Sequence, residues 1–97
     1  MELTVLIPAY NEAARLEQTV REYASYYAER DAEILIIVNG SNDKTGEIAR
    51  ALESELPNVR AWETPEKLGK GGAIYRGFQL ARGEIVAFTD ADNSTVP

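Results

Sequence analysis

The sequence predicts an α/β fold with a Rossmann-like, mostly parallel sheet, and three observations lead to this prediction. Apolar, β-rich runs alternate along the chain with helical segments of ten or more residues, an order that requires right-handed βαβ crossovers. The apolar runs are continuous, as expected of strands buried on both faces of a parallel sheet. Of the 97 residues, 44% are hydrophobic and 27% charged, which is the composition of a globular chain rather than a disordered one.

The first strand and helix are predicted within residues 3–27. Residues 3–7 form an apolar strand that Pro8 ends. Asn11 is the predicted N-cap of the helix that follows. Four side chains of this helix share one face at helical spacing, namely Leu16, Val20, Tyr23 and Tyr27.

The second strand and helix are predicted within residues 33–58. Residues 33–38 form a second buried strand, and residues 39–43 form a turn. A helix over residues 45–56 carries Ile48, Leu52 and Leu56 at intervals of four, and Pro57 ends it.

The last third of the chain holds a strand over residues 59–64, a loop over residues 65–72, a helix over residues 73–82 and a strand over residues 85–89. Gly83 is the predicted C-terminal stop of the helix. The inward face of this helix, residues 73–82, is predicted to carry Ile74, Gly77, Phe78 and Ala81.

Charge and residue usage exclude several classes of function. Sixteen acidic residues against ten basic ones leave a net charge of -6, which argues against a nucleic-acid partner and against electrostatic docking on anionic lipid. The absence of cysteine and histidine excludes a disulfide framework, a thiol nucleophile, a Cys- or His-based zinc site and a Ser-His-Asp triad. Any metal must therefore be a hard cation held by carboxylates, carbonyls or phosphate.

We expect a cytoplasmic location, at most at the cytoplasmic face of a membrane. The longest apolar run, residues 34–38, is far shorter than the ~20 residues that span a bilayer. The N-terminus lacks the basic start and apolar core of a signal peptide.

The predicted sheet indicates where a ligand binds. In open α/β sheets ligands bind beyond the carboxyl ends of the strands, where four segments with most of the polar chemistry are expected to meet. They are residues 8–12, 39–43, 65–72 and 90–93.

Asp90 and Asp92 follow the last predicted strand. Carboxylates two residues apart on an extended stretch point the same way, so both can address one cation or one diphosphate–ribose unit. Mg²⁺ or Mn²⁺ suits such a pair, because diphosphate oxygens and water complete the octahedron. The alternative is an acidic turn, which the position after a buried parallel strand disfavours.

The segment Gly69-Lys70-Gly71-Gly72 opens the third helix. Small residues let a ligand approach the backbone, the helix N-terminus favours anions, and Lys70 adds a positive charge. The segment is neither a Walker A loop nor a dinucleotide fingerprint, and a flexible turn with a solvated lysine is the alternative. Lys67 is interpreted as ordinary surface.

Tyr10 and Glu12 lie just beyond the first strand. The tyrosine ring can pack on a base, and the carboxylate can hold a ribose hydroxyl. The alternative is a helix start in which Asn11 caps and Glu12 complements the helix dipole, and both interpretations can hold together.

Taken together, the segments resemble a family 2 glycosyltransferase over essentially the whole chain. The resemblance is carried by residues 5–12 (VLIPAYNE), 39–45 (NGSNDKT), 69–73 (GKGGA), 81–84 (ARGE) and 90–92 (DAD). The GKGGA segment and the final DADNST are most similar to dolichyl- or polyprenyl-phosphate sugar transferases. The resemblance implies a GT-A fold, a nucleotide-diphosphate sugar donor, a divalent cation and inversion of the anomeric centre.

The resemblance also implies roles for individual residues. It places four residues around the nucleoside, namely Pro8, Ala9, Tyr10 and Glu12. Asp92 holds the metal, Asp90 holds the ribose or shares the metal, and Lys70 lies near the base or the diphosphate.

The chain departs from the family at Val38 and Asn39, where the family usually has two aspartates. An aspartate there accepts hydrogen bonds from the base edge, whereas Asn39 offers one acceptor and one donor. This suits uracil at least as well as guanine, so we expect a UDP-sugar rather than a GDP-sugar.

In the family, the acceptor site and the general base come after the pair that corresponds to Asp90 and Asp92, whereas this sequence stops at Pro97. We therefore expect residues 1–97 to be the donor-binding portion of a longer glycosyltransferase, inactive by itself, with membrane contact only through a later segment or the acceptor. A polyprenyl phosphate acceptor is already ionised at neutral pH, which reduces the need for a base.

Three alternatives remain open at this stage. A sugar-nucleotide nucleotidylyltransferase needs a glycine-rich loop with arginine after the first strand, which residues 8–12 do not supply. A receiver-like or structural α/β domain is the second; a receiver needs acidic residues after its first strand and a phosphorylatable aspartate after its third, and neither is visible in this sequence. The last alternative is a non-catalytic nucleotide-binding α/β fragment.

Overall fold

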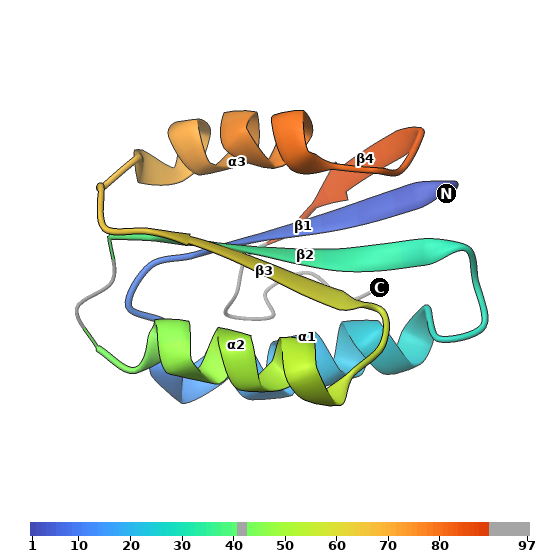
Figure 1. Cartoon of the computed structure of the whole chain (residues 1–97), viewed down its shortest axis with the longest axis horizontal. Helices are drawn as coiled ribbons and strands as arrows, with labels where there is room; N and C mark the ends of the chain where they lie inside the picture. The colour runs from blue at the N-terminus through green and yellow to red at the C-terminus, as the bar shows by residue number, and fades with distance from the viewer. Residues whose placement is uncertain (41–42, 90–97) are drawn as a thin grey trace.

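The alternating order of strands and helices predicted from the sequence is confirmed by the computed structural model of the chain, which describes residues 1–40 and 43–89. Within these ranges the elements are β1 (Leu3–Ala9), α1 (Ala13–Tyr26), β2 (Ala32–Asn39), α2 (Thr45–Glu55), β3 (Val59–Thr64), α3 (Gly69–Leu80) and β4 (Ile85–Phe88). Figure 1 shows a middle layer of strands, with α1 and α2 on one side and α3 on the other.

The described strands form one parallel sheet in the order β3-β2-β1-β4. Ala9 pairs with Val38, and Asn39 pairs with Thr64, so β1, β2 and β3 end at nearly the same level. Their carboxyl ends lie at one edge of the sheet, on the left in Figure 1. The prediction of a Rossmann-like parallel sheet is therefore confirmed.

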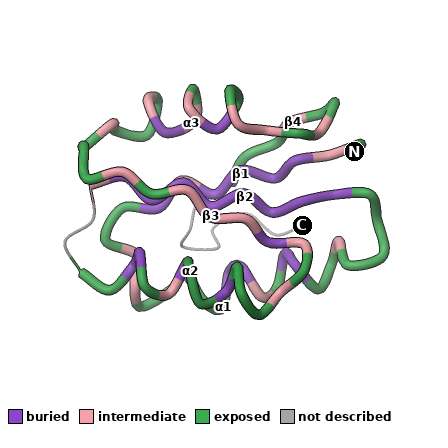
Figure 2. The backbone as a smooth tube through the Cα atoms, in the orientation of Figure 1, coloured by how far each residue is buried: buried purple, intermediate pink, exposed green. Residues whose placement is uncertain are grey.

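The core has one part on each face of the sheet. The larger part faces α1 and α2, where alternate residues of β1 and β2 pack against side chains such as Leu16 and Val20. The smaller part faces α3, where Leu6, Leu35 and Ile37 pack against Ala73. Strand β2 is buried at every position, as the continuous purple of its tube shows (Figure 2). This two-sided burial explains why its sequence is apolar without alternation.

The prediction of full burial is wrong for β4, in which Ile85 is 59% and Phe88 54% exposed. Helix α3 packs mainly against β2 and β1, and in the described part of the chain β4 is an edge strand paired with β1. Phe78 was predicted to face inward but is 51% exposed. The inward face of α3 is carried by Ala73 and Gly77, and Phe78 lies about 100° further round the helix.

Helix α3 begins earlier and ends earlier than predicted. It starts at Gly69, within the predicted loop, and ends at Leu80. Gly69 has a φ of 72°, a left-handed conformation that favours glycine. Gly83 lies beyond the helix end, where a side chain would come within 2.4 Å of the β1 backbone at Leu3 and Thr4. Its lack of a side chain therefore serves a close contact with β1.

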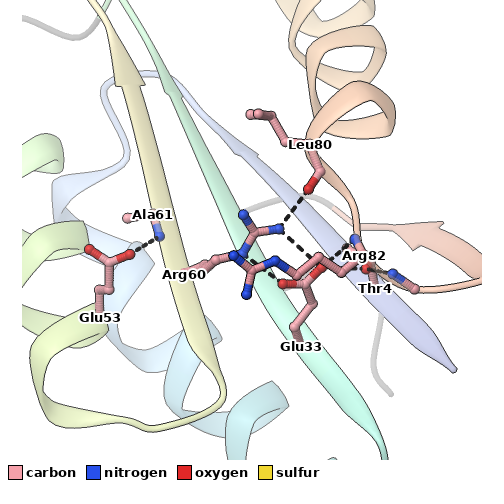
Figure 3. Close-up of polar contacts among 8 residues, drawn as sticks. Thr4, Glu33, Glu53, Arg60, Ala61, Leu80 and Arg82 are labelled. Atoms are coloured by element: carbon pink, nitrogen blue, oxygen red, sulfur yellow. Dashed lines mark hydrogen bonds and ion pairs between the residues drawn. The ribbon is translucent and has the colours of Figure 1, made fainter. Parts of the chain in front are cut away.

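A buried carboxylate, Glu33, links the strands on the α3 side of the sheet (Figure 3). It accepts hydrogen bonds from the Thr4 hydroxyl at 2.6 Å, from Arg60 Nε at 2.8 Å and from the Arg82 backbone N–H at 2.9 Å. Burial raises the pKa of the Glu33 carboxyl, but the hydrogen bonds from Arg60, Thr4 and Arg82 outweigh it, so the net pKa is lowered. The fold therefore favours the ionised form.

The same network holds the connection between α3 and β4. Arg60 donates to the Leu80 carbonyl at 2.7 Å, and the Gly83 N–H donates to the Thr4 hydroxyl oxygen at 2.9 Å. Side chains of β1, β2 and β3 thus fix the turn from which β4 starts.

Candidate functional site

Three of the four segments predicted to form the site meet at the carboxyl edge of the sheet. The Gly40 N–H donates to the Thr64 carbonyl at 2.9 Å, which joins the ends of β2 and β3. The Glu12 N–H donates to Thr45 Oγ1 at 2.9 Å, which joins the segments after β1 and β2. The fourth segment, with Asp90 and Asp92, lies outside the described residues.

The segment after β1 exposes some of its predicted nucleoside-binding residues and buries others. Ala9 is fully buried and Pro8 half-buried, Glu12 is half-buried, and the Tyr10 side chain is 41% exposed. Of these four residues Tyr10 is the most exposed, while Pro8 and Ala9 form the end of β1 itself.

Pro8 does not end the first strand, contrary to the prediction, because β1 continues to Ala9. The Leu6 carbonyl faces β4, where it accepts from the Thr89 N–H at 3.0 Å, so the nitrogen of Pro8, two residues on, faces the same way. The pairing with β4 ends at Leu6. The missing donor of Pro8 therefore costs no described ladder hydrogen bond.

The prediction that Asn11 caps the first helix is wrong. Helix α1 begins at Ala13 with Glu12 at the N-cap position and no side-chain cap of its own, while Asn11 has a φ of 51° in the left-handed region. The caps come from the segment after β2. Thr45 Oγ1 accepts from the Glu12 N–H, and Asp43 Oδ2 accepts from the Ala13 N–H at 3.4 Å.

Asp43 and Thr45 are also hydrogen-bonded to each other. Asp43 Oδ1 accepts from the Thr45 N–H at 2.9 Å and from the Thr45 hydroxyl. Hydrogen bonds from the hydroxyl and backbone N–H of Thr45, with a further one from the Ala13 N–H, lower the pKa of Asp43. Asp43 lies in the predicted site segment 39–43 and Thr45 just beyond it, but no individual role was predicted for either residue.

Lys67, which the sequence led us to interpret as ordinary surface, is exposed and contacts the segment after β1. Its ammonium lies 5.4 Å from the centroid of the Tyr10 ring, a cation–π distance. A side chain at Gly40, which has a φ of 66°, would come within 2.6 Å of Lys67 Cγ. Lys67 therefore joins the segments after β1, β2 and β3. The signal available in the sequence was its position three residues after the third strand.

Asn39 lies at the end of β2 and is buried. Its Nδ2 donates to the Ala9 carbonyl at 3.3 Å, so the amide ties the end of β2 to the end of β1. One of its two amide hydrogens is used in this contact.

The start of α3 presents an open glycine surface. Lys70 and Gly71 are exposed in its first turn, and a side chain built at Gly71 would meet nothing within 4 Å. Glycine in a helix costs stability relative to alanine. Packing thus gives no reason for Gly71, whereas the close approach of a ligand to the helix N-terminus would.

The end of β4 is fixed where it leads into the predicted metal-binding segment. Thr89 is buried, and its hydroxyl oxygen accepts from the Tyr23 hydroxyl at 3.1 Å. Within residues 1–40 and 43–89 there is no group of three acidic residues that could hold a metal. The carboxylates predicted for that role, Asp90 and Asp92, lie beyond this range. In the same ranges no helix has the length and apolar character needed to cross a bilayer.

Comparison with known proteins identifies similar sequences and folds. The sequence profile of the family described as Glycosyl transferase family 2 matches residues 4–97. Dolichyl-phosphate beta-glucosyltransferase ALG5A of Trichomonas vaginalis is 38% identical over 100 residues, which cover 96% of this chain and 31% of that protein. The chain spans between about a sixth and a third of the length of its curated relatives.

Several solved structures share the fold and are more than a quarter identical, and two of them are described here. The mannosyltransferase PcManGT from Pyrobaculum calidifontis, in complex with GDP-Man and Mn²⁺, is 32% identical with a TM-score of 0.83 over 94% of this chain and 27% of that one. Glucosyl-3-phosphoglycerate synthase from Mycobacterium tuberculosis, in complex with Mn²⁺, UDP and glucosyl-3-phosphoglycerate, is 29% identical with a TM-score of 0.73 over 93% of this chain and 33% of that one. The parallel sheet with alternating helices is thus the Rossmann-like part of a GT-A fold.

Proposed function

The chain belongs to glycosyl transferase family 2, and we propose that it is the donor-binding part of an enzyme that transfers a sugar with inversion from a nucleotide-diphosphate sugar. One observation carries the proposal. Tyr10, Gly40 and Lys67, which follow three different strands, lie together at the carboxyl edge of the parallel sheet. A half-exposed aromatic ring and a cation at this edge suit a ligand with a flat base and negative charge.

The nucleoside is proposed to lie on the segment after β1. The Tyr10 ring offers a stacking surface for the base, and the Glu12 carboxylate offers an acceptor for a ribose hydroxyl. Pro8 and Ala9 form the end of β1 beneath them. The diphosphate is proposed to lie toward the first turn of α3, where exposed backbone, the helix dipole and Lys70 favour anions.

The donor base is proposed to be uracil. A carboxylate at position 39 could accept from two N–H groups of guanine, whereas Asn39 has one acceptor oxygen and, beside its contact with Ala9, one remaining amide hydrogen. That pair complements the adjacent N–H and carbonyl of uracil. The two solved neighbours described above differ, since one is a complex with GDP-Man and the other a complex with UDP, so the preference depends on Asn39.

A divalent cation, Mg²⁺ or Mn²⁺, is proposed to be held by Asp92, with Asp90 sharing it or holding the ribose. Carboxylate oxygens are the ligands that these hard cations prefer, and two solved neighbours are complexes with Mn²⁺. When bound, the cation stabilises negative charge on the departing diphosphate. The chain's own part is to hold the nucleotide at Tyr10 and Glu12, and to keep the start of β4 in place through Glu33.

The acceptor is proposed to be a lipid phosphate of the dolichyl or polyprenyl type, as in the name of the relative from Trichomonas vaginalis. A phosphate acceptor is ionised at neutral pH, which reduces the need for a general base. Acceptor binding and any base are proposed to lie in sequence that follows residue 97 in relatives. We place the enzyme in the cytoplasm, at the cytoplasmic face of a membrane where its acceptor is a lipid.

A thermal-shift experiment on the 97-residue chain tests the proposal. UDP with Mn²⁺ is expected to raise Tm, and the rise is expected to vanish in Asp92→Ala. GDP binding at least tenfold tighter than UDP would overturn the base preference alone. A folded chain whose Tm does not respond to any nucleoside diphosphate with Mn²⁺ or Mg²⁺ would overturn the donor-binding role itself.

A further inference from the structure

We propose that Asp43 and Thr45 are positioning residues, which hold the nucleoside-binding segment, residues 10–12, in the conformation that donor binding needs. The inference rests on the proposed function for its effect on nucleotide affinity. Its structural part, a clamp between the segments after β1 and β2, stands on the described contacts alone.

The clamp replaces an ordinary helix cap. A helix N-terminus leaves backbone N–H groups without helical partners, and a side chain just before the helix usually accepts from one of them. At α1 these acceptors come from residues 30 and 33 positions further along the chain: Thr45 Oγ1 accepts from the Glu12 N–H, and Asp43 Oδ2 accepts from the Ala13 N–H. The start of α1 therefore depends on the segment after β2.

The segment between β1 and α1 needs such support. Asn11 is in the left-handed region with a φ of 51°, which is unfavourable for residues other than glycine, although asparagine tolerates it better than most. This turn determines where the side chains of Tyr10 and Glu12 point. Losing the clamp would let Asn11 return to a more favourable conformation, and the two proposed nucleoside-binding side chains would move with it.

Thr45 is the central member of the clamp. It is fully buried, and its hydroxyl accepts from the Glu12 N–H while donating to Asp43. Valine has nearly the same shape but cannot make either contact, whereas serine keeps the hydroxyl. The pair of variants Thr45→Val and Thr45→Ser therefore separates the hydrogen bonds from the packing.

The matched control is Asn58→Ala at the opposite edge of the sheet. Asn58 Nδ2 donates to the Ala24 carbonyl at 3.0 Å, which ties the start of β3 to α1. Its loss removes one side-chain hydrogen bond to the same helix, away from the proposed site. It is expected to lower Tm without changing nucleotide affinity, as a merely structural contact would.

Two measurements on the 97-residue chain test the clamp. The first is UDP affinity with Mn²⁺ by calorimetry. We expect Thr45→Val and Asp43→Ala to weaken this affinity by about tenfold, which corresponds to the loss of one hydrogen bond. Thr45→Ser is expected to remain near wild type. The second is amide hydrogen exchange at Glu12 and Ala13, which needs no ligand and is expected to accelerate in Thr45→Val but not in Asn58→Ala.

The outcomes separate this inference from the proposed function. If the wild-type chain binds UDP and Thr45→Val binds it equally well, or if Thr45→Ser is as weak as Thr45→Val, the positioning role is overturned. If the wild-type chain binds no nucleotide, the proposed function fails and the clamp is judged by exchange. Unchanged exchange at Glu12 and Ala13 in Thr45→Val would then overturn the clamp as well.

Discussion

Replacing Glu33 by alanine tests the reasoning about the fold most severely. The carboxylate accepts hydrogen bonds from Thr4, Arg60 and the Arg82 backbone, and its removal leaves all three donors without this partner. Breaking a buried ion pair from one side costs about 3–5 kcal/mol. Because the Arg60 side chain is 28% exposed, water can hydrogen-bond to its guanidinium and offset part of this cost. We therefore expect Glu33→Ala to lower the free energy of unfolding by about 2–4 kcal/mol.

This loss is a large fraction of the roughly 5–15 kcal/mol by which a small domain is stable. It corresponds to a fall in Tm of about 10–25 °C for a chain of this size. Urea denaturation followed by circular dichroism measures the free energy of unfolding. The control is Glu55→Ala, which breaks an exposed ion pair with Arg21 and should change stability little.

The same carboxylate predicts a dependence on pH. The pKa of Glu33 is lower in the folded chain than in the unfolded chain, so its contribution is complete above the unfolded value of about 4.3 and is lost as pH falls through the folded value. When the pH is lowered below about 4, the free energy of unfolding should therefore fall less in Glu33→Gln than in the wild-type chain. A loss under about 1 kcal/mol for Glu33→Ala at pH 7, or one equal to that of Glu55→Ala, would refute the assignment of Glu33 as the link between the strands.

Three further predictions concern the proposed donor site. Gly71→Ala should stabilise the chain by up to about 1 kcal/mol, since the added methyl meets no atom within 4 Å. The same change should weaken UDP binding, and tighter or unchanged binding would contradict a close approach of the ligand to Gly71. Lys67→Ala should weaken UDP binding by about two- to fivefold, more at low salt, whereas Arg30→Ala, which removes a similar contact with Tyr26 far from the site, should not. Asn39→Asp should shift the preference from UDP toward GDP in competition calorimetry, and an unchanged ratio would remove position 39 from base recognition.

The sequence was sufficient to predict the arrangement of the elements, because strands that are buried on both faces of a parallel sheet consist mainly of apolar residues. Strand β2 is buried at all its positions, and the continuous apolar run over residues 34–38 predicted this for its central part. Since parallel strands end at the same edge, the sequence also predicted that the segments after β1, β2 and β3 meet.

Contacts between distant segments could not be predicted in the same way. Asn11 has the residue type of an N-cap, but the acceptors for α1 come from Asp43 and Thr45, which local reasoning does not consider. Lys67 lies beside Gly40, and its ammonium lies over the Tyr10 ring, so this contact joins three loops that are far apart in the sequence. The exposure of β4 depends on which strands α3 covers, and that is a property of the packing rather than of the strand's own sequence.

The central claim, that the chain is a metal-dependent donor-binding domain, is tested most directly by calorimetric titration of UDP into the folded 97-residue chain. With Mn²⁺ present we predict saturable binding of one UDP per chain, lost on addition of EDTA and lost in Asp92→Ala. Binding that is equal with and without the metal would contradict the role of the cation. No binding of any nucleoside diphosphate by the folded chain would contradict the claim as a whole.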